Sequence, residues 1–212
     1  MFDRFRQWMS DSSAYPFLLK EREDVIFVHI TKTAGTSVRK TLDFNRVGGS
    51  QFRKHYTAME IMDLVGKERW ASAFTFAFVR NPWDRLFSHY RFKLRKKKVD
   101  GPFGKEGFVK WGMSALDPVR LKRRSEDLRN TSAQLDWLVD EEGQLAVRFI
   151  GRFENLQEDF AKVCEHIGVT ASLGHANQSL PVLHYRDFYV PELMERVEEV
   201  YGKDIEAFGY EY

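Results

Sequence analysis

Cysteine is nearly absent from this sequence. The 212 residues include one cysteine, Cys164, so an internal disulfide and a cysteine-rich metal site are both excluded. A long apolar run is also missing. The first residues, MFDRFRQWMSDSSAYPF, alternate charged and aromatic side chains and lack the apolar stretch of a signal peptide or membrane anchor. These absences predict a cytoplasmic protein with no integral membrane segment, in which Cys164 packs among apolar neighbours.

Charge of one sign is not in excess either. The 33 basic and 31 acidic side chains nearly cancel to a formal net charge of +2, so no global field gathers nucleic acid around the chain. The six histidines are scattered, and no cluster of them predicts a metal site. We therefore expect neither a nucleic-acid partner nor a metal, and any affinity for anions must be local.

The apolar content of 43% is enough to bury one substantial core in a chain of this length. Short apolar runs predict buried strands at 25–30 and 74–79, a third strand is expected at 145–150, and a helix follows each of them. Continuous apolar strands of this kind are typical of parallel sheets covered on both faces. The sequence thus predicts an α/β protein: a P-loop-like three-layer fold with a central, mostly parallel sheet flanked by helices. Strands 25–30 and 74–79 are expected to be inner strands.

The expected organisation is a single domain over 1–212. Residues 1–24 lead into its first strand. The segment at about 99–130 shows little periodicity, and we expect a variable insertion there with irregular or short helical structure. Helices are predicted to start at Pro82 and Pro191 and to end at Gly168, because proline favours the first helical position and glycine the residue after the last.

The loop TKTAGTS, residues 31–37, lies between the first predicted strand and a helix. Backbone N–H groups and the helix dipole converge on an anion in such a loop. Gly35 removes side-chain bulk, and Lys32 supplies a mobile positive charge. The loop therefore predicts a phosphate cradle, to which the backbone around Ala34 and the hydroxyls of Thr33, Thr36 and Ser37 contribute.

Other interpretations of this loop stay open. In nucleotide triphosphatases and kinases the lysine directly follows the last glycine, whereas here Lys32 precedes Gly35. A noncatalytic nucleotide-binding protein of the same fold is another alternative, and a plain solvated turn is a third.

Five stretches resemble one enzyme family. FVHITKTAGTS (27–37) resembles the 5′-phosphosulfate loop of the carbohydrate sulfotransferases, the group that includes the heparan sulfate 2-O- and chondroitin sulfotransferases and many bacterial relatives. FAFVRNPWDRLFSHYRF (76–92) resembles their 3′-phosphate segment. Further similar stretches are QLDWL (134–138), FIGRFENLQEDF (149–160) and HYRDFYVPEL (184–193). One departure is Thr31, where the family usually has proline, so the loop loses a stiff φ angle and gains a donor.

The resemblance implies a sulfotransferase that moves a sulfo group from 3′-phosphoadenosine 5′-phosphosulfate to a hydroxyl, here of a carbohydrate, and releases adenosine 3′,5′-bisphosphate. It implies that Arg80 and Ser88 hold the 3′-phosphate, a group that ATP lacks. It also implies that Tyr185 and Arg186 close over the donor. From the residues alone, Arg80 can instead pair with Asp84 while Ser88 faces solvent.

A general base is implied between the two phosphate segments, and His55 matches it by context. His55 precedes a helix predicted to start with a capping box of Thr57 and Glu60. Its unperturbed pKa lies near neutrality, which suits removal of the hydroxyl proton. His29 is the main rival, but it lies in the first predicted strand. Lys32 is expected to neutralise charge on the leaving phosphate during direct in-line transfer, without a metal.

Two basic segments, 91–98 and 120–124, are candidates to line a groove for an anionic glycan acceptor. The alternative is that they are ordinary solvated faces.

Overall fold

The structure is a computed structural model that describes residues 15–20, 22–44, 55–99, 103–121, 130–174 and 183–212. The chain divides into two compact units, which are described separately. Unit 1 comprises 1–79 and 137–176, and unit 2 comprises 80–136 and 177–212. The expectation of one domain over 1–212 stays a prediction, and most of the lead-in, 1–14, lies outside the described residues.

Unit 1 contains a four-stranded sheet in the order β1-β2-β3-β4. Its strands are β1 (Leu18–Leu19), β2 (Arg22–Val28), β3 (Phe74–Val79) and β4 (Phe149–Arg152). β3 pairs in parallel with both β2 and β4, and β1 is antiparallel to β2. The prediction of a mostly parallel sheet with β2 and β3 as inner strands is confirmed.

Two strand boundaries differ from the predicted ones. β2 ends at Val28, so His29 and Ile30 already belong to the following loop. The third strand was expected at 145–150 but is β4, at Phe149–Arg152. The start at Leu145 was wrong because this residue forms an isolated antiparallel bridge with Val139, and its side chain is 53% exposed.

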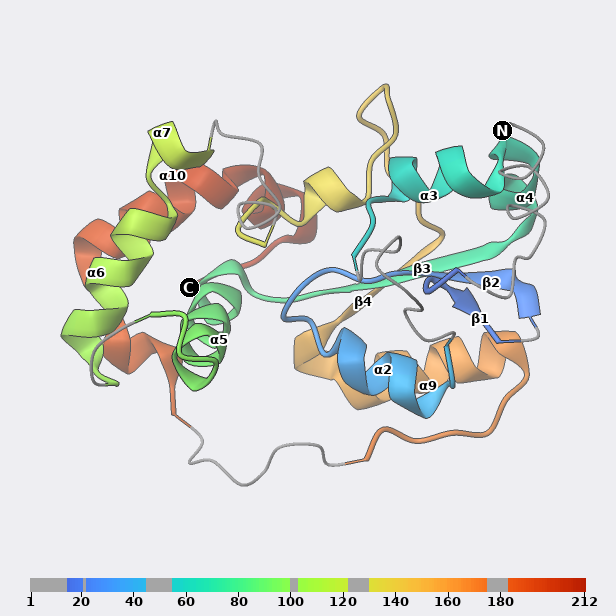
Figure 1. Ribbon diagram of the computed structural model, residues 1–212, viewed down its shortest axis with the longest axis horizontal. Coiled ribbons are helices and arrows are strands. Elements are labelled where there is room, and N and C mark those ends of the chain that lie inside the picture. The colour runs from blue at the N-terminus through green and yellow to red at the C-terminus, as the bar shows by residue number, and fades with distance from the viewer. Residues whose placement is uncertain (1–14, 21, 45–54, 100–102, 122–129, 175–182) are drawn as a thin grey trace. The chain divides into compact units, whose positions relative to one another are not determined.

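Helices cover both faces of the sheet in unit 1 (Figure 1). One face carries α2 (Gly35–Thr41) and α9 (Leu156–Ile167), and the other carries α3 (Ala58–Val65) and α4 (Lys67–Ser72). The three layers of the predicted α/β fold are thus present. The start of α9 follows a 3-10 turn, η3 (Phe153–Asn155), and its end is the left-handed Gly168, as predicted.

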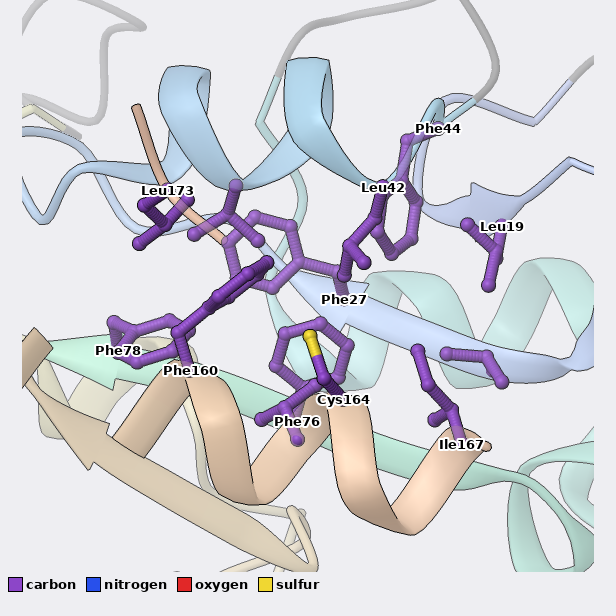
Figure 2. Close-up of a cluster of buried hydrophobic side chains, with 13 residues drawn as sticks. Leu19, Phe27, Leu42, Phe44, Phe76, Phe78, Phe160, Cys164, Ile167 and Leu173 are labelled. Atoms are coloured by element: carbon purple, nitrogen blue, oxygen red, sulfur yellow. The ribbon is translucent and has the colours of Figure 1, made fainter. Parts of the chain in front are cut away.

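An apolar cluster fills the space between the sheet and the helices α2 and α9 (Figure 2). Phe27 and Phe76 stack at 4.8 Å between ring centroids, and Phe160 of α9 packs into the same cluster. Cys164 is 4% exposed here, and burial raises the pKa of its thiol. The predicted packing role of Cys164 therefore agrees with its surroundings.

Unit 2 is helical. Its elements are α5 (Pro82–Arg95), α6 (Lys105–Ala115), α7 (Pro118–Leu121), η4 (Tyr185–Phe188) and α10 (Pro191–Phe208). A further 3-10 turn, η2 (Leu135–Trp137), spans the boundary between the units. Aromatic side chains join the helices of unit 2: Phe87 of α5 meets Phe108 of α6 edge-on at 5.2 Å. The described part of segment 99–130 is thus short helical structure, as expected.

None of the helices in the described ranges has the length and apolarity needed to cross a membrane.

Candidate functional site

The loop between β2 and α2 has an unusual backbone. Lys32 and Ala34 both adopt positive φ angles, 69° and 64°, although neither is glycine. Ala34 is left-handed and the next residue, Gly35, is the first of α2. A left-handed residue followed by a helical one turns successive N–H groups towards one side, which makes an anion-binding concavity. The energetic cost of two such residues is typical of functional loops.

Hydrogen bonds within the loop hold this shape. The hydroxyl of Thr33, which is completely buried, donates to the carbonyl oxygen of Ile30 at 3.0 Å. The N–H of Ser37 donates to the carbonyl of Ala34 at 2.8 Å and closes the first helical turn. Thr33 therefore directs its hydroxyl hydrogen into the loop, and its backbone N–H is the group it can offer to an anion.

Gly35 is required by its neighbour His29. A Cβ atom at position 35 would lie 2.0 Å from Cδ2 and 2.3 Å from Nε2 of the His29 ring. Real Cβ atoms do not approach other atoms so closely, and His29 is buried against Phe27 at 5.4 Å between ring centroids. The imidazole of His29 is thus packed against the start of α2, directly behind the loop.

His55 is held by the same segment. Its Nδ1 lies 2.9 Å from the carbonyl oxygen of His29, and the two imidazole centroids are 4.4 Å apart. The Trp137 ring meets His55 edge-on at 6.3 Å. Because a carbonyl oxygen only accepts, Nδ1 must carry the proton, so in neutral His55 the basic nitrogen is Nε2. The predicted capping box of Thr57 and Glu60 is present, and α3 begins directly after Thr57.

In unit 2, Arg80 pairs with Asp84, the alternative that the sequence left open. Nη2 and Nε of Arg80 lie 2.7 and 2.9 Å from the same oxygen, Oδ2 of Asp84. Ser88 follows Asp84 by four residues on α5 and is half-buried. Residues four apart share one face of a helix, so Asp84 and Ser88 lie one turn apart on the same side of α5.

The backbone of Arg80 is bound as firmly as its side chain. Its N–H donates to Oε1 of Gln134 at 2.8 Å, and its carbonyl accepts from Nε2 of Gln134 at 2.8 Å. Asp204 accepts in turn from the backbone N–H groups of Gln134 and Leu135 at 2.7 and 2.8 Å. Reasoning from the sequence did not identify Gln134 or Asp204 as functional. The available signal was Asp204 itself, a charged residue on the buried face of α10.

Tyr185 and Arg186 lie against the end of the chain. Nη2 of Arg186 donates to the carbonyl of Tyr212 at 2.7 Å, and its guanidinium lies over the rings of Tyr185 and Tyr212. The neighbouring Glu211 accepts a hydrogen bond from Asn81, the residue that caps α5. Unit 2 thus brings Tyr185 and Arg186 near the start of α5 through the last two residues of the chain.

The sequence-predicted site residues fall into two groups. The loop 31–37 and His55 belong to unit 1. Arg80, Tyr185 and Arg186 belong to unit 2, together with Ser88, which lies two turns into α5. His184, at the start of η4, is exposed. No group of three or more His, Cys, Asp or Glu side chains in the described ranges is placed to hold a metal ion.

The two basic segments are only partly described. In 91–98, the guanidinium groups of Arg91 and Arg95 lie over the rings of Phe87 and Phe92, and residues 95–98 are exposed. In 120–124, Arg120 donates to Ser114, and 122–124 lie outside the described residues.

The structure thus shows a loop of anion-binding shape after a parallel strand, with a histidine oriented beside it. The chain belongs to the sulfotransferase family, whose model matches residues 15–211. It is 34% identical over 116 residues to an uncharacterized protein of Archaeoglobus fulgidus, a match that covers 55% of this chain and 85% of the relative. It is also similar to the crystal structure of a sulfotransferase from Alicyclobacillus acidocaldarius, with 15% identity, 95% of each chain covered and a TM-score of 0.41. The predicted family is confirmed, and the enzyme class is that of a sulfotransferase using a sulfo donor.

Proposed function

We propose that this sulfotransferase uses 3′-phosphoadenosine 5′-phosphosulfate as its donor and transfers the sulfo group to a hydroxyl of a carbohydrate, with His55 as the general base. The observation that carries the proposal is the hydrogen bond from Nδ1 of His55 to the carbonyl of His29. It orients a basic Nε2 and ties His55 to the segment that leads into the phosphate loop. A base and a leaving-group site joined through one short segment are what a direct transfer requires.

The transfer proceeds in one step. The acceptor oxygen attacks sulfur as its proton passes to Nε2 of His55, and the bond between sulfur and the bridging oxygen breaks. The electron pair of that bond stays on the 5′-phosphate of the departing adenosine 3′,5′-bisphosphate. Lys32 and the loop N–H groups neutralise the charge that grows there, by the positioning and electrostatics known from phosphoryl transfer.

The loop residues Lys32 to Ser37 bind the 5′ end of the donor. Lys32 supplies the charge, Gly35 and Ala34 supply backbone N–H groups, and the hydroxyls of Thr36 and Ser37 supply directional donors. Thr36 is exposed and Ser37 half-buried, which leaves both at the surface of the loop.

Arg80 and Ser88 bind the 3′-phosphate, and Tyr185 with Arg186 cover the nucleotide. The ion pair with Asp84 supports this role because it fixes the plane of the Arg80 guanidinium before a phosphate arrives. The guanidinium of Arg186 lies over the ring of Tyr212, and this ring meets Trp83 of α5 edge-on at 5.6 Å, which supports a place for η4 near the start of α5.

The acceptor is an anionic glycan, bound through the basic residues of 91–98 and 120–124. The exposed positions 95–98 carry one arginine and three lysines, which favours an acidic partner.

A binding experiment tests the donor. Adenosine 3′,5′-bisphosphate should bind at least about tenfold more tightly than adenosine 5′-phosphate, because a charge-assisted contact contributes about 1.5–3 kcal/mol. Arg80→Ala should abolish this preference, and Arg120→Ala, which removes an exposed arginine of the same unit, should preserve it. Equal affinities in the wild type, or better stabilisation by ATP with Mg²⁺, would contradict the proposed donor.

A product experiment tests the reaction. Purified protein is incubated with isotopically labelled donor and a panel of acidic glycans, neutral glycans and small alcohols, and sulfated products are detected by mass spectrometry. Sulfation of glycans is expected. Sulfation of small alcohols only would replace the proposed acceptor while leaving the sulfotransferase class unchanged.

A further inference from the structure

Gln134 contacts the backbone of Arg80 on both sides of the residue. The amide oxygen of Gln134 accepts the Arg80 N–H, and the amide nitrogen donates to the Arg80 carbonyl, each at 2.8 Å. Two strands exchange hydrogen bonds in the same pattern across a paired residue. Gln134 is completely buried, and it comes from a loop 54 positions further along the chain. The side chain of Gln134 thus pairs with both the backbone N–H and the backbone carbonyl of Arg80, as a neighbouring strand would within a sheet.

Asp204 fixes the orientation of this amide. Oδ2 of Asp204 accepts from the Gln134 backbone N–H at 2.7 Å and from Gln134 Nε2 at 3.3 Å, while Oδ1 accepts from Leu135 N–H at 2.8 Å. A carboxylate only accepts, so the amide group of Gln134 cannot be turned over without placing two oxygens against each other. Asp204 is completely buried on α10. It therefore determines which end of Gln134 meets which backbone atom of Arg80.

A second buried charged residue, Arg85, holds the loop that carries Gln134. Arg85 is 3% exposed and donates to the carbonyls of Ser132 and Asn130, which precede Gln134 in this loop. The Tyr201 hydroxyl donates to the carbonyl of Thr131 at 2.8 Å. The loop before η2 is thus held at 130, 131, 132, 134 and 135, and rigid support of this kind is what accurate ligand placement requires.

The two ends of Arg80 are held by different partners. Its backbone is bound to Gln134, and its guanidinium is bound to Asp84. With both ends fixed, the direction of the side chain is defined before a ligand arrives. A bidentate contact between arginine and a phosphate depends strongly on this direction.

We propose that Gln134, held by Asp204, is a positioning residue that sets the preference of this enzyme for a nucleotide with a 3′-phosphate. The inference rests on the proposed role of Arg80 in binding that phosphate. Gln134 itself is completely buried. Its effect on binding passes through the backbone of Arg80.

The test compares two affinities in one protein. Isothermal titration gives the dissociation constants of adenosine 3′,5′-bisphosphate and adenosine 5′-phosphate, and their ratio measures the 3′-phosphate preference. Gln134→Met keeps the length of the side chain and removes both hydrogen bonds. We expect it to lower the ratio by about fivefold or more, while the affinity for adenosine 5′-phosphate stays within about twofold. Asp204→Asn should lower the ratio in the same direction.

The control is Gln157→Met in unit 1. Gln157 also donates from Nε2 to a backbone carbonyl, that of Leu173 at 3.2 Å, so the variant makes the same substitution and loses a side-chain hydrogen bond away from Arg80. It should keep the wild-type ratio. If Gln134 has a purely structural role, Gln134→Met and Gln157→Met should both melt at a lower temperature, and the ratio of the two dissociation constants should be unchanged in each.

The outcomes separate the inference from the proposed function. A wild type without preference for the 3′-phosphate overturns the role of Arg80 and the inference with it. A wild type with the preference and a folded Gln134→Met variant that retains it overturn the inference alone. If Gln134→Met does not fold, Asp204→Asn takes its place, because it leaves Gln134 itself intact and alters the carboxylate that orients its amide group. An unchanged ratio in that variant likewise overturns the inference.

Discussion

Nδ1 of His55 donates a hydrogen bond to the carbonyl oxygen of His29, 2.9 Å away, although 26 positions separate the two residues. The bond selects the tautomer in which Nε2 is the basic nitrogen. It also ties His55, the proposed base, to the segment that continues into the loop at Lys32.

His55→Ala should separate catalysis from donor binding. We expect turnover to fall by about 10²–10⁴-fold, the usual contribution of a positioned general base, with nearly unchanged affinity for adenosine 3′,5′-bisphosphate. In the wild type the rate should rise with pH as an imidazole loses its proton, because the neutral form accepts the hydroxyl proton. Initial rates and isothermal titration on the same preparations measure both quantities.

His166→Ala is a suitable control, since this histidine stacks on Phe74 at 3.8 Å, at the opposite end of β3 from the residues that follow Val79. It should retain turnover and the pH profile. Near-normal turnover of His55→Ala would transfer the role of base to His29 or His184.

Local signals in the sequence predict β3 of unit 1 and the start of α5 in unit 2. The run FTFAFV followed by Arg80, Asn81 and Pro82 gives β3 and the start of α5 at the residues found, because apolar pattern, cap and proline agree there. The third strand was displaced because Leu145 to Ile150 is mostly apolar, although only its last two residues belong to β4. Pairing of Leu145 with Val139 depends on a tertiary contact that periodicity does not reveal.

Gly35→Ala should destabilise the protein through a clash with His29. The added Cβ would lie 2.0 Å from Cδ2 of the imidazole, and overpacking of this kind typically costs about 1–3 kcal/mol. Affinity for adenosine 3′,5′-bisphosphate should fall as well, since the loop and the ring cannot both keep their places. Urea unfolding and titration with the nucleotide measure the two effects.

The partner substitution identifies the cause. In the double variant His29→Ala with Gly35→Ala the clash is absent, so the combined loss of stability should be smaller than the sum of the single losses. Gly202→Ala is the control: nothing lies within 4 Å of a Cβ there, and alanine favours helix. Additive losses at positions 29 and 35 would contradict the steric explanation.

Two substitutions of Lys32 should agree in activity and differ in stability. Lys32→Ala is expected to lower turnover and donor affinity together, because the ammonium group is proposed to contact the bound donor and the leaving phosphate. Lys32→Gly should be equally inactive but about 1 kcal/mol more stable than Lys32→Ala, since the φ of 69° suits glycine. Lys40→Ala, at an exposed position of α2, should change neither property. Equal stability of the two Lys32 variants would contradict the backbone argument.

The candidate site was predictable where its residues are close in sequence. Lys32 to Ser37 form one loop, and their spacing carries the signal. Gln134 and Asp204 lie 70 positions apart, and neither belongs to a recognisable phosphate motif. Asp204 could have been noticed because it follows Leu193, Val197 and Tyr201 on the buried stripe of α10, where an unpaired carboxylate would be costly. Its partner Gln134 begins the family-like stretch QLDWL, but its contact with Arg80 could only come from the structure.

Asp159 should stabilise unit 1 at neutral pH and lose this effect in acid. Its carboxylate accepts the Arg152 N–H at 2.8 Å and pairs with Lys162 at 2.8 Å. Burial alone would raise the pKa of Asp159, but the hydrogen bonds from Lys162 and Arg152 outweigh burial and hold this pKa below its ordinary value of 3.8. A lowered pKa in the folded state means that the ionised carboxylate is more favourable in the folded protein than in the unfolded chain. The stabilisation is therefore present above the ordinary value and is lost as pH falls through the folded pKa.

Asp159→Asn should accordingly lower the free energy of unfolding by about 1.5–3 kcal/mol at pH 7, the range for a hydrogen bond to a charged group. The difference from wild type should shrink in urea titrations at about pH 3, below the ordinary carboxyl pKa of 3.8, because the stabilisation belongs to the ionised form. Glu158→Gln is the matched control, because Glu158 also pairs with Lys162, at 3.3 Å, but its side chain is 75% exposed. It should cost less than about 1 kcal/mol at either pH. A loss in Asp159→Asn that is the same at pH 7 and pH 3 would assign the role of Asp159 to packing rather than to its charge.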